Sequence, residues 1–241
     1  MNEFSLPAQP LLAEQANWLA PARGRLLRRV SVARRRRILD LGAGYGAVTG
    51  ELARRGGGSV VALDREVTAV AAALAQTPAL NVGGDALALP FKRAAFDLVF
   101  CQCVLLWVGD VATAVAQIHR VLQPGGVLIA LEPDYPAMME YPPESAVGDI
   151  WLTALRRVGA EPAVGRKLPG ALAAQGFEVT VDLLERLERP SPTRFDFLRT
   201  LPLTPDEQAA LNRAETAARH LSQPWEHIAH LPFLLITAER P

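Results

Sequence analysis

From Arg37 to Glu132 the sequence alternates short apolar, β-branched runs with helix-like stretches that end at glycine or proline. The short runs that have the length of strands are 38–42, 59–64, 79–84, 96–102 and 127–132. Runs that are apolar on both faces are typical of buried parallel strands, and the intervening helices are typical of crossover connections. The alternation therefore predicts a doubly wound α/β sheet, on which ligands bind at the carboxyl ends of the strands.

The remaining sequence is less regular. Residues 132–144 are rich in proline and aromatic side chains and are predicted to leave the sheet, whereas 177–188 and 232–240 are strand-like. Residues 189–231 are punctuated by proline and are predicted to be helical. The other expected helices cover 11–27, 47–55, 66–76, 111–122, 147–158 and 168–175.

Composition excludes several classes of function. The chain has 241 residues, of which 25 are basic and 25 acidic, so no net charge draws it toward nucleic acid or an anionic membrane. No apolar run approaches the roughly 20 residues that cross a bilayer, and residues 1–20 lack the pattern of a signal peptide. Cys101 and Cys103 alone supply neither a disulfide framework nor a zinc site. We therefore predict a cytoplasmic monomer or homodimer with no nucleic acid, membrane or metal partner.

The most informative motif is a glycine-rich turn between a strand and a helix, Asp40-Leu41-Gly42-Ala43-Gly44-Tyr45-Gly46. Glycine permits positive φ and close approach to a ligand, and the following helix offers free amide donors. Read alone, Gly42, Gly44 and Ala47 match the dinucleotide pattern, and Asp64 stands where an acid would bind a ribose. A nicotinamide-dependent oxidoreductase is therefore one alternative.

Two further acids favour a different ligand. Asp40 precedes the glycine turn, where a carboxylate repels a pyrophosphate but attracts an ammonium or sulfonium group. Asp85 ends the third strand and can accept a hydrogen bond from the exocyclic amine of an adenine, with Ala86 and Leu87 lining its face. A ligand that has a cationic amino-acid end, a ribose and an adenine is S-adenosylmethionine.

The same residues resemble the class I S-adenosylmethionine-dependent methyltransferases, especially the small-molecule branch that includes ubiquinone and menaquinone C-methyltransferases. The resemblance covers 37–134 and rests on ILDLGAGYG, GDALALPF, FDLVFCQCVLLWV and IHRVLQPGGVLIALEPD. It implies a Rossmann-like, seven-stranded, doubly wound sheet whose last strand is antiparallel, for which 232–240 is the candidate. We predict one domain over 1–241, divided into an N-terminal helical cap (1–36), a cofactor-binding core (37–132) and substrate-lid insertions (133–165 and 189–231). The long helical segment 189–231 departs from the family, which usually has few residues before its final hairpin, so the insertions are interpreted from the local sequence.

The resemblance further implies that the cofactor lies across the ends of the strands. The implied contacts are with the methionine portion (Asp40, Gly42, Ala43, Gly44), the ribose (Asp64, with Arg65 beside it), the adenine (Asp85, Ala86) and the end of the fourth strand (Cys101, Gln102).

Substrate contacts are read locally, from the two insertions. Aromatic residues and methionine there form either an apolar substrate wall or packing between insertion and sheet; they are Tyr135, Met138, Tyr141, Trp151 and Trp225. His220, His227 and His230 are either surface residues or candidates for a base, which methyl transfer needs only when the nucleophile arrives protonated. No catalytic residue is assigned from the sequence.

These patterns together predict a methyltransferase that acts on a small, partly apolar metabolite. Three alternatives stay open. They are a fold relative that binds the cofactor but catalyses a cyclisation or rearrangement in natural-product biosynthesis, a non-catalytic binding module, and the oxidoreductase.

Overall fold

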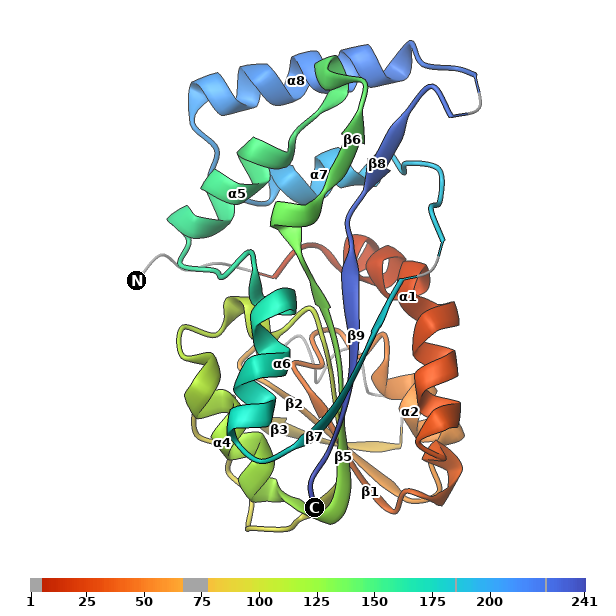
Figure 1. Ribbon diagram of the computed structural model, residues 1–241, viewed down its shortest axis with the longest axis vertical. Coiled ribbons are helices and arrows are strands. Elements are labelled where there is room, and N and C mark those ends of the chain that lie inside the picture. The colour runs from red at the N-terminus through yellow and green to blue at the C-terminus, as the bar shows by residue number, and fades with distance from the viewer. Residues whose placement is uncertain (1–5, 67–77, 185, 224) are drawn as a thin grey trace.

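A computed structural model describes residues 6–66, 78–184, 186–223 and 225–241 (Figure 1). Seven strands form one sheet in the order β3-β2-β1-β4-β5-β9-β7. Their bounds are Arg37–Leu41 (β1), Ser59–Asp64 (β2), Ala79–Gly83 (β3), Phe96–Gln102 (β4), Leu122–Pro133 (β5), Glu178–Leu183 (β7) and Phe233–Glu239 (β9). Only β9 runs antiparallel to its neighbours in this sheet. The predicted doubly wound sheet with an antiparallel last strand is confirmed.

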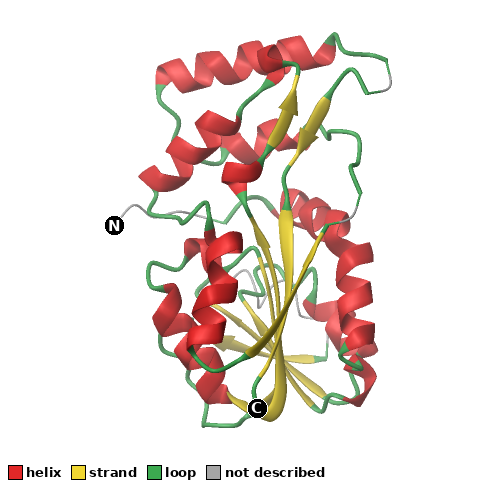
Figure 2. Cartoon of the chain, in the orientation of Figure 1, coloured by secondary structure: helices red, strands yellow, loops and turns green. Residues whose placement is uncertain are grey.

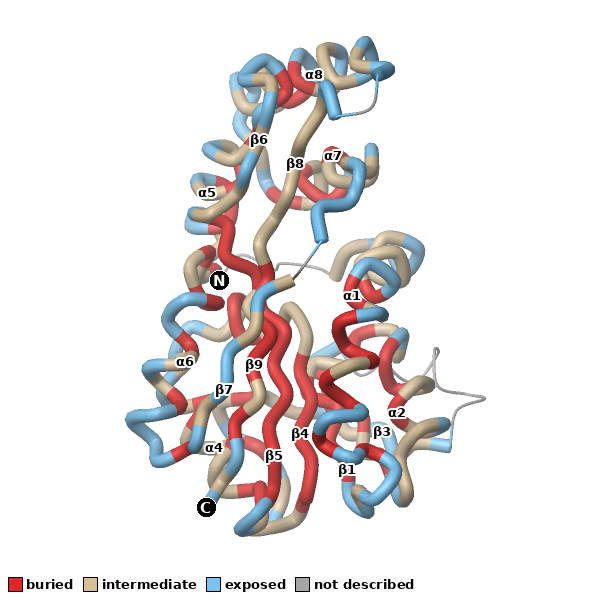
Figure 3. Tube along the Cα trace, turned by 45° about the vertical axis from the view of Figure 1, so that its right-hand side comes forward, coloured by how far each residue is buried: buried red, intermediate tan, exposed pale blue. Residues whose placement is uncertain are grey.

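Helices cover both faces of this sheet (Figure 1). On one face lie α1 (Gln9–Arg29) and α2 (Thr49–Arg55), and on the other lie α4 (Val111–Val121) and α6 (Val164–Ala174). Successive residues of β4 pack on opposite faces of the sheet: Phe100 packs on the face covered by α1, and Cys101 packs on the face covered by α4. This double burial explains the unbroken apolar run of β4, which lies in the buried centre of the molecule (Figure 3).

A second layer of structure lies beyond the carboxyl ends of the strands (Figure 2). It contains α5 (Gly148–Arg157), α7 (Thr193–Arg199), α8 (Pro205–Arg219) and two short strands, β6 (Met139–Tyr141) and β8 (Ile228–His230), which pair antiparallel. We call this layer the lid. The prediction that 189–231 is entirely helical is wrong at β8, because a strand of three residues is too short to show a period of two.

Other boundaries differ modestly from the sequence prediction. The strand expected at 177–188 ends at Leu183, and the strand expected at 127–132 begins five residues earlier, at Leu122. The helix expected at 66–76 lies almost wholly outside the described residues. None of the helices in the described parts of the chain is long and apolar enough to cross a membrane.

The lid is held together by a buried ion pair. Arg194 of α7 donates to Glu140 of β6 at 3.1 Å, and the side chains are 12% and 9% exposed. Glu140 also accepts from the amides of Val147 and Gly148 at the start of α5. A third contact joins Arg194 Nη2 to His227 Nε2 at 2.9 Å, next to β8. One cation therefore connects β6, α5, α7 and the segment that leads to β8.

Candidate active site

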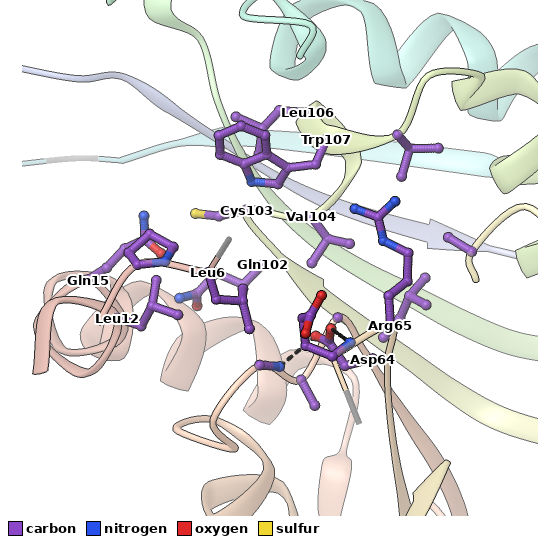
Figure 4. Close-up of a pocket in the computed structure, with 18 of the residues that line it drawn as sticks. Leu6, Leu12, Gln15, Asp64, Arg65, Gln102, Cys103, Val104, Leu106 and Trp107 are labelled. Atoms are coloured by element: carbon purple, nitrogen blue, oxygen red, sulfur yellow. Dashed lines mark hydrogen bonds between the residues drawn. The ribbon is translucent and has the colours of Figure 1, made fainter. Parts of the chain in front are cut away.

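A cavity opens at the carboxyl ends of β1, β2 and β4, between α1 and the lid (Figure 4). Most of the residues predicted to bind cofactor line it; they are Asp40, Gly42, Ala43, Gly44, Asp64, Arg65, Asp85, Ala86 and Gln102. Cys101 does not, because its position in β4 directs it into the core on the α4 side, where it is fully buried. Two residues later, Cys103 lines the cavity in its place.

The glycine turn leaves no room for a side chain at Gly42. Gly42 has φ +72°, and a Cβ at this position would lie 2.4 Å from Val104 Cγ2. Gly44 also has positive φ, and its amide donates to Asp64 Oδ2 at 2.7 Å. Because the amide of Gly44 already donates to Asp64, it is not free to donate to a pyrophosphate.

Asp40 places a buried carboxyl group beneath this turn. It is 3% exposed, and Oδ2 accepts from the Thr49 hydroxyl at 2.5 Å. Burial raises the pKa of Asp40 to about 6, although Thr49 and the nearby Arg23 both act in the opposite direction. A cation in the cavity would compensate the ionised form.

Two more acids follow around the cavity edge. Asp64 lies at the end of β2 and accepts from the amide of Glu66 at 3.0 Å as well as from Gly44. Asp85 follows β3 and accepts from the amide of Leu87 at 2.9 Å. Since a carboxylate has about four acceptor sites, both acids keep capacity for ligand hydroxyl or amine groups.

The part of the cavity nearest the lid is apolar and aromatic. Its lining residues include Leu106, Trp107, Val108, Tyr135, Trp151, Phe197, Leu201 and Phe233. The rings of Tyr135 and Trp151 lie 5.0 Å apart, and both residues belong to the predicted substrate set. Of the other members, Met138 packs against the core outside this lining, while Tyr141 and Trp225 are 58% and 56% exposed.

Comparison with known proteins identifies the fold and its cofactor. Residues 39–130 match the family model for a methyltransferase domain. Residues 39–130 thus form a class I S-adenosylmethionine-dependent methyltransferase domain. S-adenosylmethionine is accordingly the cofactor, and the domain match favours it over the nicotinamide-dependent alternative.

Curated relatives match this chain over part of their length. The demethylmenaquinone methyltransferase of Thermus thermophilus is 35% identical over 145 residues, which are 58% of this chain and 62% of that protein. The malonyl-[acyl-carrier protein] O-methyltransferase of Enterobacter lignolyticus is 36% identical over 104 residues, which are 43% of this chain and 41% of that protein. The chain thus spans less than two thirds of these relatives.

Solved structures share the fold over more of the chain. The YcgJ protein of Bacillus subtilis superposes with a TM-score of 0.67 at 19% identity, covering 92% of this chain and 98% of that one. The [4+2]-cyclase SpnF superposes with a TM-score of 0.60 at 22% identity, covering 100% of this chain and 85% of that one.

The three histidines considered as bases lie in the lid, and none is among the described residues that line the cavity. His220 ends α8, where its ring contacts the carbonyl of Thr216 at 2.7 Å. Burial lowers the pKa of both His227 and His230, so each is a weaker base than an exposed histidine. Within the described ranges, no three His, Cys, Asp or Glu side chains gather as metal ligands.

Several residues that line the cavity belong to no recognisable sequence motif. Gln15 of α1 and Trp107, which follows β4, face the cavity from opposite sides (Figure 4). Cys103 adopts φ +57°, and burial raises the pKa of its thiol well above the ordinary value. Burial likewise raises the pKa of Tyr135. Both groups are therefore protonated at neutral pH and do not serve as ready bases.

Proposed function

We propose that this methyltransferase transfers the methyl group of S-adenosylmethionine to a small, partly apolar metabolite bound beneath the lid. The proposal rests on one cavity that is lined both by the acids at the strand ends, such as Asp40, and by aromatic residues of the lid, such as Trp151. Such a site is mostly apolar with a few polar anchors, as small-molecule sites usually are.

The strand-end residues fit the parts of the cofactor. Asp40 provides negative charge for its cationic amino-acid end, and Gly42 lets the backbone approach closely without a Cβ. Asp64 would accept from the ribose hydroxyls, with Arg65 beside it. Asp85 would accept from the adenine amine, while Ala86 packs against the ring. The core position of Cys101 removes it from the set of contacts we propose.

Transfer is an in-line displacement on a sulfonium, so the protein must hold the nucleophile close and exclude water. When bound, the cofactor supplies a methyl group that is already activated for displacement. Tyr135, Trp151 and Phe197 would exclude water and orient the acceptor. Since Cys103 and Tyr135 stay protonated, we do not propose either of them as a base for the acceptor.

Turnover with labelled S-adenosylmethionine tests the reaction. Hydroquinones and malonyl-acyl carrier protein are suitable first acceptors, because relatives carry demethylmenaquinone and malonyl-acyl carrier protein methyltransferase names. We expect an apolar aromatic acceptor to yield S-adenosylhomocysteine and a methylated product in equal amounts. Product that forms without S-adenosylhomocysteine would instead support the cyclisation or rearrangement alternative, for which the shared fold of SpnF is the observation in favour.

A non-catalytic binding role predicts a third result. In that case the protein would bind S-adenosylhomocysteine, but no acceptor would be methylated, and an Asp64→Ala variant would lose cofactor affinity while keeping its biological effect. If Asp64→Ala loses both its affinity for the cofactor and its biological effect, the result supports the enzymatic proposal.

A further inference from the structure

Arg23 is a buried cation that connects the N-terminal helix to the cavity. It is 3% exposed, and its Nε donates to Glu51 of α2 at 2.8 Å. Its Nη1 donates to the carbonyl of Ala16 at 2.8 Å and to Oε1 of Gln102 at 3.0 Å. Glu51 already balances the charge, so the bond to Gln102 is an additional contact, and it is the one that reaches a side chain at the cavity.

This bond determines which way the Gln102 amide points. A guanidinium carries only donors, so Gln102 must present Oε1 to Arg23 and turn Nε2 away from it. Within the described residues, the structure gives Nε2 no acceptor. Gln102 lines the cavity, and in the view of Figure 4 it lies between Gln15 and Asp64. Arg23 therefore directs an N–H donor toward the ligand.

The cofactor offers a suitable acceptor. Its amino-acid end carries an ammonium group, which suits Asp40, and a carboxylate, which needs donors. A full positive charge next to the sulfonium would repel it, whereas an amide polarised by a buried guanidinium donates without adding that charge. We propose that Arg23 is a positioning residue, which fixes the Gln102 amide so that it binds the methionine carboxylate of the cofactor.

The proposal also assigns a role to α1. Because Arg23 lies on α1 and Gln102 ends β4, the donor is oriented only when this helix is docked. Cofactor affinity is thus coupled to the docking of a segment that precedes the cofactor-binding core, and the coupling acts through the carboxylate.

Binding of two ligands to an Arg23→Met variant tests the proposal without turnover. S-adenosylhomocysteine has the carboxylate, whereas 5′-methylthioadenosine lacks the whole amino-acid end. Glu51 keeps its bond to Arg55 at 2.5 Å, so the substitution leaves no unpaired acid. By calorimetry we expect about tenfold weaker binding of S-adenosylhomocysteine and less than about twofold change for 5′-methylthioadenosine. The matched control is Arg29→Met, which breaks an exposed pair with Asp182 on the same helix and should alter neither affinity.

Variants at Gln102 separate positioning from a general structural effect. Gln102→Leu should reproduce the selective loss, and the double variant with Arg23→Met should bind no more weakly than either single variant, since both remove one donor. Gln102→Glu should bind S-adenosylhomocysteine more weakly still, because it points an oxygen at the carboxylate. Equal losses for both ligands in Arg23→Met or in Gln102→Leu, or additive losses in the double variant, would overturn the proposal. If thermal unfolding shows that Arg23→Met does not fold, Gln102→Leu decides alone.

Discussion

Replacing Asp40 by asparagine should make the protein more stable at neutral pH and weaken its hold on the cofactor. Burial raises the pKa of Asp40 from 3.8 to about 6, so the folded state disfavours the carboxylate. About two pKa units correspond to about 3 kcal/mol of stability lost when the carboxyl group ionises. Asparagine has nearly the same shape and still offers an oxygen to the Thr49 hydroxyl, which now donates at 2.5 Å.

The sign of the effect follows from proton binding. Between about pH 4 and pH 6 the folded state holds a proton on Asp40 that the unfolded chain has released, so wild-type stability falls as the pH rises through this window. The amide of the asparagine variant does not titrate. We therefore expect the free energy of unfolding of Asp40→Asn to exceed that of wild type by up to about 3 kcal/mol near pH 8. The difference should vanish near pH 4.

Urea denaturation of both proteins across this pH range measures the difference. Glu132 is also buried and has its pKa raised to about 7, but it is present in both proteins and cancels from the difference. Asp182→Asn, which removes an exposed carboxylate, is the control and should show no such gain. An Asp40→Asn protein that is less stable than wild type near pH 8, or a difference that does not change with pH, would refute the reasoning. In parallel, S-adenosylmethionine and S-adenosylhomocysteine should both bind about tenfold more weakly to Asp40→Asn, because both carry the ammonium group that Asp40 is proposed to attract.

Three further substitutions test other parts of the site. Gly42→Ala should lower the free energy of unfolding by at least about 2 kcal/mol in urea, because φ is +72° and the new Cβ meets Val104 at 2.4 Å. Trp151→Ala removes a buried ring packed on Tyr135 and should cost about 3 kcal/mol in thermal or urea unfolding. It should also raise the KM for the acceptor without changing S-adenosylhomocysteine affinity. His230→Asn should leave kcat within about twofold of wild type, since this residue lies in the lid and outside the cavity lining; a loss of about a hundredfold would restore it as a candidate base.

The core of the fold is predictable because its signals are local. β1, β2 and β3 are short runs next to a glycine or proline turn, β4 is an apolar run, and the acids at positions 40, 64 and 85 stand where the first three strands end. Their meeting in one cavity follows from the parallel order of the strands, so the sequence contains enough information to bring them together. The lid lacks such signals: β6 and β8 have three residues each and pair across about ninety positions of sequence.

Side-chain direction is the other limit of sequence reasoning. Cys101 and Cys103 lie two apart and would share a face in a regular strand, yet Cys101 is in the core and Cys103 lines the cavity. The difference arises because β4 ends at Gln102 and Cys103 turns to φ +57°, which no local pattern of residues signals. In the lid, Tyr141 points to solvent while Trp151 lines the cavity, although both are aromatic residues of the same insertion.

Two buried ionisable residues, Asp40 and Arg23, bear on the function of this protein. Burying Asp40 costs stability, and Arg23 is a buried cation that shares its partner, Glu51, with Arg55. A fold selected for stability alone would replace such groups with apolar residues of similar volume. Here these groups lie at the carboxyl end of the sheet. The carboxyl group of Asp40 and the amide of Gln102, which accepts from Arg23, line the same cavity. The two polarities match the ammonium and the carboxylate of one amino-acid end, and this match is the ground on which we propose that they bind the cofactor.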